Sequence, residues 1–231
     1  MQNRLNQQKD LIIDLGRRMW QSRFVAANAG NISVLLDDET ILTTPTGVSK
    51  GFMRAEMLIT VDRKGQILQA EKDYRPSSEL KMHLEVYNQR PDVRAVVHTH
   101  PPGATTFAVL GQTLSENILP EVVLNLGIIP LAAYGLPSSA EIPNSLRPHL
   151  QTSDAILLQN HGCLTVGADL ANAYFKLEIL EHYCQILYRC RQLGKFTQLA
   201  DAEIEKLIAL RKKLNLPGKA LLQGKQHFFQ F

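Results

Sequence analysis

The stretch Ala95-Val96-Val97-His98-Thr99-His100 closes an apolar run with two histidines that are separated by one residue. In an extended strand the side chains of residues i and i+2 point to the same face, so these two imidazoles would stand side by side. A second apolar run, which begins after Asp154, ends in the pair His161-Gly162. Three neutral imidazoles with an open fourth position are typical of a catalytic zinc site. The sequence therefore predicts a metal site at these three histidines, against the plainer alternative of histidines that only pack.

The length and composition of the chain indicate an ordinary globular protein. Of its 231 residues 45% are apolar, which is enough to build a core, and 20% are charged. The formal net charge of +3 is small for this length and gives no support to binding of nucleic acid or of a membrane surface. No internal repeat or composition break marks a linker, so we expect one domain over residues 1–231.

The cysteines and the apolar stretches bear on where the protein works. The three cysteines are odd in number and lack C-x-x-C spacing, so we expect reduced thiols rather than disulfides or a cysteine-based zinc site. No apolar stretch approaches the roughly 20 residues of a membrane-spanning helix. We therefore expect a cytoplasmic protein.

Hydrophobic periodicity predicts hairpins that are mixed with flanking helices. The expected strands are residues 32–36, 40–43, 58–62, 66–69, 95–100, 155–159 and 163–166. The expected helices are the segment up to about residue 25 and residues 76–90, 105–110, 141–150, 170–193 and 202–214. Residues 120–126 and 128–132 fit a helix or a strand equally well. This pattern predicts an α/β fold with a largely antiparallel sheet that is covered by helices.

Ser77-Ser78-Glu79 lies where a loop becomes a helix. The first turn of a helix has free N–H groups and a partial positive charge, so hydroxyl groups beside it can complete an anion site. Capping of the helix is the simpler interpretation of this motif when it is taken alone. The turns at Gly30-Asn31 and Thr46-Gly47 could supply further N–H and side-chain donors.

Two cations and one further histidine lie near these turns in the sequence. Lys50 and Arg75 are the nearest cations. A lysine in a loop is usually solvated, so we expect Lys50 to be an exposed loop residue rather than a phosphate ligand. His83 lacks a paired histidine, and we expect it on the surface or partly packed.

Five motifs occur in one order at compatible spacings. They are Gly30-Asn31-x-Ser33, Thr44-Pro45-Thr46-Gly47, Pro76-Ser77-Ser78-Glu79, Ala95-Val96-Val97-His98-Thr99-His100 and Leu158-Gln159-Asn160-His161-Gly162. As an ordered set they resemble the zinc-dependent class II aldolase/adducin family, and most closely its L-fuculose-1-phosphate aldolase branch. The resemblance runs from the first predicted helix to the long helix that follows the last motif.

The resemblance implies a fold, an assembly and a set of site residues. The implied fold is a three-layer α/β/α sandwich around a largely antiparallel sheet, in a homotetramer with active sites at subunit interfaces. By this resemblance zinc would be held by His98, His100 and His161, and Mn²⁺ or Co²⁺ could replace it. Glu79 would be the proton-transfer base and would also ligate the resting metal. The implied phosphate-binding residues are Gly30, Asn31, Thr46, Gly47, Ser77 and Ser78.

The chain departs from the family pattern at one catalytic position. In fuculose-phosphate aldolase a tyrosine from the neighbouring subunit, shortly after the H-x-H motif, protonates the aldehyde oxygen. The corresponding region here is residues 120–124, which contain no tyrosine. We predict Glu121 as the replacement acid, with Tyr134 and Tyr87 as the alternatives.

The activity implied by the resemblance is cleavage of a ketose 1-phosphate, L-fuculose 1-phosphate or a similar sugar, to dihydroxyacetone phosphate and a small aldehyde. An aldolase for 5-deoxyribulose or methylthioribulose 1-phosphate is the nearest alternative. Related sugar-phosphate epimerases have aspartate in place of Glu79, and related dehydratases generally lack the Ser-Ser-Glu segment, so both are less favoured. The alternative from another class is a non-catalytic scaffold like the head domain of adducin. That domain lacks the metal histidines, which this chain retains.

Overall fold

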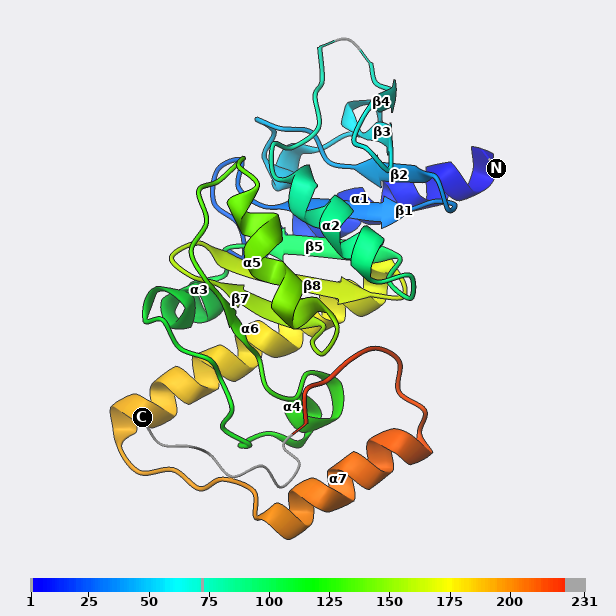
Figure 1. Cartoon of the computed structure of the whole chain (residues 1–231). Coiled ribbons are helices and arrows are strands. Elements are labelled where there is room, and N and C mark those ends of the chain that lie inside the picture. The colour runs from blue at the N-terminus through cyan, green and yellow to red at the C-terminus, as the bar shows by residue number, and fades with distance from the viewer. Residues whose placement is uncertain (1, 72, 223–231) are drawn as a thin grey trace.

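The computed structural model describes residues 2–71 and 73–222, and one eight-stranded sheet runs through it (Figure 1). The strand order is β4-β3-β2-β1-β5-β8-β7-β6. All neighbouring strands are antiparallel except β6 and β7, which are parallel, so the predicted largely antiparallel sheet is confirmed. The strands are β1 (Asn31–Leu35), β2 (Thr40–Thr43), β3 (Ile59–Asp62), β4 (Ile67–Gln69), β5 (Ala95–Thr99), β6 (Leu131–Ala132), β7 (Ala155–Leu158) and β8 (Gly162–Gly167).

Helices cover both faces of the sheet and make three layers (Figure 1). One face packs against α2 and α5, and the other packs against α1, α3 and α6. The small helix α4 packs against α6 and α7, below the sheet in the view of Figure 1. The helices are α1 (Gln2–Gln21), α2 (Leu80–Gln89), α3 (Pro102–Val109), α4 (Pro120–Asn125), α5 (Glu141–Leu150), α6 (Leu170–Leu193) and α7 (Asp201–Lys213), with short 3-10 turns η1 (Lys50–Phe52) and η2 (Ala55–Met57).

The central strand β5 is apolar because both of its faces are covered. Ala95 and Val97 belong to the core on the α1 and α6 side, whereas Val96 belongs to the core on the α2 and α5 side. A strand that is buried on both faces needs no alternation of apolar and polar residues. His98 shares the face of Val96, since the two are separated by one residue, and its imidazole is therefore turned toward α2.

The observed bounds differ from the predicted ones mainly at helix starts. The helix predicted from residue 76 begins at Leu80, because the carbonyl of Ser77 accepts the N–H of Leu80 and the Ser77 hydroxyl accepts the N–H of Glu79. These two bonds form a turn ahead of the helix. Of the two ambiguous segments, the first forms α4 over residues 120–125, with a proline in its first turn. Only two residues of the segment 128–132 become the strand β6.

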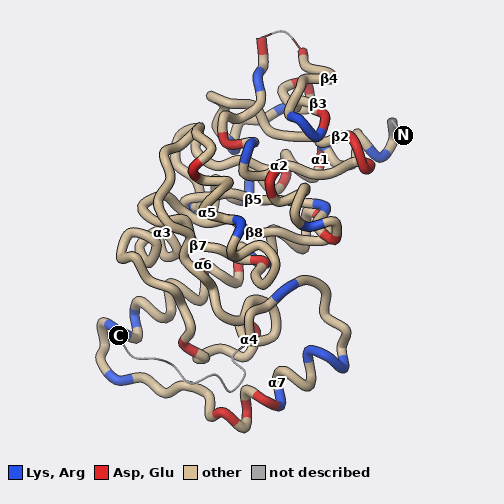
Figure 2. Tube along the Cα trace, viewed as in Figure 1, with Lys and Arg blue, Asp and Glu red and all other residues tan. Residues whose placement is uncertain are grey.

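In the view of Figure 2, basic and acidic residues are interspersed along the described part of the chain. The helix α7 has acidic residues in its first turn and basic residues in its last turn, the distribution that the helix dipole favours. Arg211 in that last turn is 8% exposed and donates to the carbonyls of Leu124 and Gly218, so it fastens α7 to α4. Within residues 2–71 and 73–222, no helix has the length and apolar character that a bilayer crossing needs.

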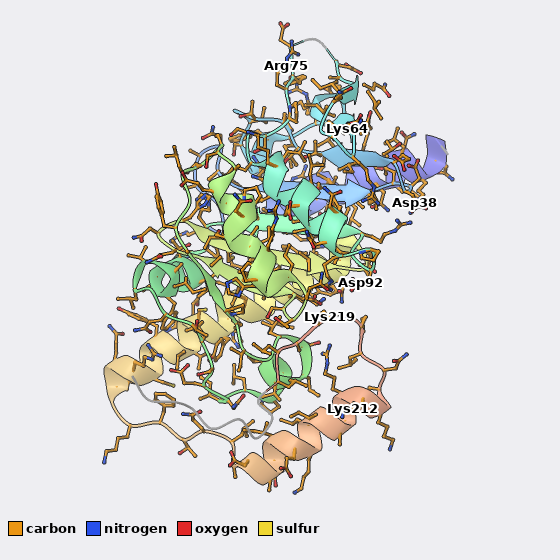
Figure 3. All side chains as sticks on the ribbon, viewed as in Figure 1. Asp38, Lys64, Arg75, Asp92, Lys212 and Lys219 are labelled. Atoms are coloured by element: carbon orange, nitrogen blue, oxygen red, sulfur yellow. The ribbon has the colours of Figure 1, made fainter. Side chains whose placement is uncertain are left out.

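Asp154 is a buried carboxylate that joins three parts of the chain. It accepts hydrogen bonds from Arg90 Nη2 at 2.8 Å, from Lys176 Nζ at 2.7 Å and from the N–H of Lys219 at 2.9 Å. A Cβ at Gly218, where φ is +87°, would lie 1.9 Å from Asp154 Oδ2, so glycine allows this close approach. Figure 3 shows Lys219 and Asp92, a second partner of Arg90, close together on this side of the molecule. The cluster ties the C-terminal segment to the sheet.

Replacement of Asp154 by alanine is expected to lower the free energy of unfolding by about 3–5 kcal/mol. Lys176 would stay buried without its counter-charge, and the buried Arg90 would keep only the half-exposed Asp92. Urea unfolding followed by circular dichroism measures this loss. Asp92→Ala is the matched control. Its side chain is 47% exposed, and the expected loss is no more than about 1 kcal/mol. Equal losses in the two variants would contradict this account of the cluster.

Candidate active site

The three predicted metal-binding histidines converge on one point at the end of the central strands. His98 is in β5, His100 follows it, and His161 lies in the turn between β7 and β8. Every pair of ring centroids is 4.8 Å apart. One nitrogen atom from each ring lies within 4.8 Å of the other two. Three equal separations surround a single point, as the ligands of one metal ion do.

The pairing of β5 with β8 explains how these distant residues meet. The two strands are antiparallel, with Thr99 opposite Cys163, so the turn before β8 lies beside the end of β5. A Cβ on Gly162 would lie 2.4 Å from the Thr99 carbonyl oxygen and 2.6 Å from His100 Cδ2. A side chain at this position would force the histidines apart. Position 162, directly after His161, therefore requires glycine for steric reasons.

The tautomer of His98 leaves a nitrogen lone pair turned toward the other rings. His98 Nδ1 lies 2.9 Å from the carbonyl oxygen of Cys163. A carbonyl only accepts, so the proton is on Nδ1 and the lone pair is on Nε2. His98 Nε2 is 2.9 Å from His100 Nε2. Burial lowers the pKa of His100 to about 3, so this ring is neutral at physiological pH. His100 thus has the uncharged form that ligates metals.

Glu79 brings a carboxylate to the same point from the start of α2. Its Oε1 is 3.1 Å from His161 Nε2, and its Oε2 is 3.3 Å from His98 Nε2. Asn31 Nδ2 donates to Glu79 Oε2 and to Ser77 Oγ, each at 3.2 Å. Burial alone would raise the pKa of Glu79, but the contacts with His161 and His98 bring it below its usual range. The carboxylate is therefore ionised at neutral pH.

The chemistry of these donors fits a divalent cation. In the described part of the chain no lysine or arginine pairs with Glu79, whose charge faces only imidazoles and one amide group. Nδ1 of His161 is buried without a hydrogen-bond partner. Three imidazoles and a carboxylate form a ligand set that zinc accepts. A bound cation would supply the positive charge that this cluster lacks.

A cleft of about 370 Å³ opens beside the histidines. This volume falls within the roughly 300–1,000 Å³ of most small-molecule sites. Of the residues predicted to bind phosphate, Gly30, Asn31, Thr46, Ser77 and Ser78 line the cleft, whereas Gly47 does not. Gly47 instead adopts φ of +72° in the turn that carries its neighbour. The remaining lining residues are Asn28, Ala29, Pro45, Glu79, His100, Pro137 and His161.

The loop before α5 forms a wall of the cleft that sequence reasoning missed. Pro137 lines the cleft, and Lys81 Nζ donates to the carbonyl of Ser138 at 3.0 Å, which fixes this loop to α2. In the sequence, Gly135-Leu136-Pro137-Ser138 has only the composition of a turn. The contact with α2 is tertiary, so no local signal could have revealed it.

A buried polar column continues along the facing sides of β1 and α2. Ser33 Oγ lies 2.7 Å from His83 Nδ1 and 2.8 Å from the Tyr87 hydroxyl. The expectation that His83 is exposed or partly packed is wrong, since it is fully buried against Ser33 and burial lowers its pKa to about 3. Asn31 precedes Ser33 by two residues and Glu79 precedes His83 by one helical turn. The column therefore sets the position of Glu79 over β1.

The structure separates the three residues predicted as the replacement acid. Tyr87 is 2% exposed on α2, where its hydroxyl bonds to Ser33 of β1, and it does not line the cleft. Tyr134 is 54% exposed and belongs to the loop that contributes Pro137 to the cleft. Glu121 is exposed on α4 and does not line the cleft of its own chain. Figure 1 shows α4 at the opposite end of the molecule from the start of α2. A role for Glu121 requires a neighbouring subunit and stays a prediction.

Lys50 contradicts the expectation of an exposed loop residue, because its side chain is only 1% exposed. The turn η1 packs against α1, where Gly16 makes room: a Cβ at Gly16 would lie 2.9 Å from the Lys50 carbonyl oxygen. Nζ donates to the carbonyls of Asn28 at 3.1 Å and Val48 at 2.8 Å. The other nearby cation, Arg75, is exposed at the outer edge of the molecule in Figure 3.

Comparison with known proteins agrees with this geometry. The 3-oxo-tetronate 4-phosphate decarboxylase of Haemophilus influenzae is 34% identical over 87% of this chain and 95% of its own length. The L-fuculose phosphate aldolase of Methanococcus maripaludis strain S2 is 34% identical over 76% of this chain and 93% of its own length. A solved structure of L-fuculose 1-phosphate aldolase superposes with a TM-score of 0.81 at 26% identity, and covers 90% of this chain and 96% of that one.

A family profile matches the part of the chain that contains the motifs of the site. The profile described as Class II Aldolase and Adducin N-terminal domain matches residues 10–188, a range that contains the three histidines, Glu79 and the cleft. From this match and the two relatives, the chain belongs to the class II aldolase/adducin family.

Proposed function

We propose that the chain is a zinc-dependent class II aldolase that cleaves a ketose 1-phosphate to dihydroxyacetone phosphate and a small aldehyde. The observation that carries the proposal is the convergence of three imidazoles and the Glu79 carboxylate beside a cleft whose lining includes hydroxyl and amide groups. L-fuculose 1-phosphate is the first substrate to test, and 5-deoxyribulose and methylthioribulose 1-phosphates are the next.

The reaction breaks the bond between C3 and C4 of the ketose and leaves its electron pair on C3, next to the C2 carbonyl. A divalent cation held by the three histidines would act as a Lewis acid and lower the energy of the enediolate that results. The Glu79 carboxylate, ionised and held by Asn31, is the group within reach to carry the proton that C3 gains. Asn31 thereby aims the carboxylate as well as bordering the cleft.

The phosphate is assigned to the hydroxyl and amide groups of the cleft, which belong to Asn31, Thr46, Ser77 and Ser78. Gly30 lets this turn approach the central strand, since a Cβ there would lie 2.9 Å from the His98 carbonyl oxygen. Phosphate binding at a distance from the reacting carbons fixes the orientation of the substrate. As the aldehyde forms, the C4 hydroxyl loses its proton, and the group that accepts this proton returns it as an acid in the reverse reaction. We extend the proposal to a homotetramer, since this group, Glu121 in our prediction, would come from a neighbouring chain.

A second candidate function is decarboxylation of a 3-oxo-tetronate 4-phosphate, which the relative from Haemophilus influenzae favours. Loss of carbon dioxide from such a substrate also places an electron pair next to a carbonyl, and it leaves the same enediolate of dihydroxyacetone phosphate. That reaction needs no acid for an aldehyde oxygen. Against it, the lining residues of the described chain include no lysine or arginine to pair with the substrate carboxylate.

A substrate screen separates the two candidates. The zinc-loaded protein is incubated with pentulose and hexulose 1-phosphates and with 3-oxo-tetronate 4-phosphates, and release of dihydroxyacetone phosphate is followed with a coupled reductase. The proposal expects release from a ketose 1-phosphate, with one equivalent of aldehyde. Release of dihydroxyacetone phosphate only from the sugar acid, together with carbon dioxide, would show that the chain is a decarboxylase rather than an aldolase. Absence of product from both classes would contradict the proposed function.

Glu79→Gln is expected to keep zinc and dihydroxyacetone phosphate binding but to slow exchange of deuterium from water into C3 of that ligand by about 100-fold or more. Glutamine preserves the shape of the side chain and removes the base. Proton NMR measures the exchange, and metal analysis measures the zinc. Glu39→Gln, at an exposed site in the β1–β2 hairpin, is the control and should exchange like the wild type. Normal exchange in the Glu79 variant would refute its role as the base.

A further inference from the structure

A phosphorylated substrate in the cleft would meet no positively charged side chain among the described lining residues. A phosphate monoester carries a charge near −2 at neutral pH, because its second pKa is about 6. Among the described residues that line the cleft there is no lysine or arginine. Neutral donors satisfy the oxygens of the anion and offset part of the cost of taking its charge out of water, and a nearby positive charge lowers that cost further. A positive charge close behind the lining would do so.

Lys50 is a buried ammonium group directly behind this lining. Its Nζ donates to the carbonyl of Asn28, a residue that lines the cleft, and to the carbonyl of Val48, in the same loop as the lining residue Thr46. One peptide group therefore separates the charge from the cleft at Asn28. In the described part of the chain Lys50 has no carboxylate partner, so no counter-charge cancels its field.

The charged groups on the elements around Lys50 are directed to solvent. On α1, Gly16 packs against Lys50 Cβ, and its charged neighbours Asp14 and Arg18 form an ion pair whose side chains are half exposed. Arg17 on the same helix is exposed. Near η1 and η2, Arg54 pairs with Glu56 at 2.6 Å in an exposed position. The cleft-lining turns 28–31 and 44–49 contain no charged residue.

We propose that Lys50 is a positioning residue that supplies the positive charge of the phosphate site and clamps together the two turns which form it. The inference rests on the proposed function, since it presumes that the cleft binds a phosphorylated compound. It extends that function by assigning the charge to a residue that touches no substrate atom and acts through the backbone of Asn28 and Val48.

Because Lys50 is buried, the proposal predicts that phosphate affinity depends on pH. Burial lowers the pKa of its ammonium group to about 8. The charge is therefore present below this pH and is lost as the pH rises through it. Phosphate affinity is expected to be highest at neutral pH and to fall on the alkaline side. Bound phosphate favours the charged form, so binding also shifts the titration of Lys50 to higher pH.

The test is a calorimetric titration of the zinc-loaded protein with glycerol phosphate, a probe that has the phosphate but no carbonyl group. Affinities are measured from about pH 7.5 to about pH 9.5, where the probe is fully ionised. Wild type, Lys50→Met, Lys50→Arg and Lys64→Met are compared. Lys64 is exposed in the β3–β4 hairpin and is labelled in Figure 3, so its variant controls for a change in net charge.

The methionine variant is expected to bind roughly tenfold more weakly or worse at the lower end of this pH range, because the charge is lost in a poorly screened site. The arginine variant keeps its charge throughout the range and should lose the alkaline decline that the wild type shows. Lys64→Met should match the wild type. A purely structural lysine would not make the wild type and the arginine variant differ in pH dependence.

Two results would overturn the inference: equal affinity in the methionine variant, or the same pH profile in the wild type and the arginine variant. If the methionine variant fails to fold, the comparison of those two pH profiles decides alone. Failure of the wild type to bind the probe at any pH would be a distinct result. It would refute the proposed phosphate site, and with it this inference.

Discussion

The antiparallel contact between β5 and β8 is the constraint on which the site depends. It places the turn that carries His161 beside the end of the strand that carries His98 and His100, and Gly162 lets the two backbones approach. The same contact fixes the His98 ring through the carbonyl of Cys163. A shift of one residue in this register would turn the imidazole of His98 to the opposite face of the sheet. The cluster of ligands and the central sheet are therefore a single structural unit.

A second contact, between α2 and β1, places the Glu79 carboxylate beside the three histidines. Polar residues at alternate positions of β1 meet residues one helical turn apart on α2: Asn31 holds Glu79, and Ser33 holds His83. The result is a carboxylate that faces imidazoles and, among the described residues, no lysine or arginine, an arrangement that suits a bound cation. In our proposal, an anion in the adjoining cleft would be balanced by the positive charge of Lys50 behind the lining. The proposed metal and phosphate would then bind side by side.

The features that could be predicted from the sequence are those with a local signature. The bounds of α5, α6 and β2 match the prediction, and each of these elements has a clear period and a clear end. The histidines and Glu79 could be predicted to meet because an ordered set of motifs resembles a known family, and the structure brings them together.

The features that the sequence did not reveal depend on tertiary contacts. The burial of Lys50 requires Gly16 on a distant helix, and the burial of His83 requires a serine on β1. The strand β6 exists because it pairs with β7, and its sequence alone is equally compatible with a helix. Glu121 lies outside the cleft of its own chain, so its role depends on an assembly that one chain does not contain.

X-ray absorption at the zinc edge of the metal-loaded protein tests the central claim most directly, because it reports the atoms around the ion. The account predicts one zinc per chain with three imidazole nitrogens at about 2.0–2.1 Å and oxygen as the remaining ligand. A spectrum with sulfur at about 2.3 Å, or with fewer than three imidazoles, would contradict the site described here. So would a protein that retains no stoichiometric metal.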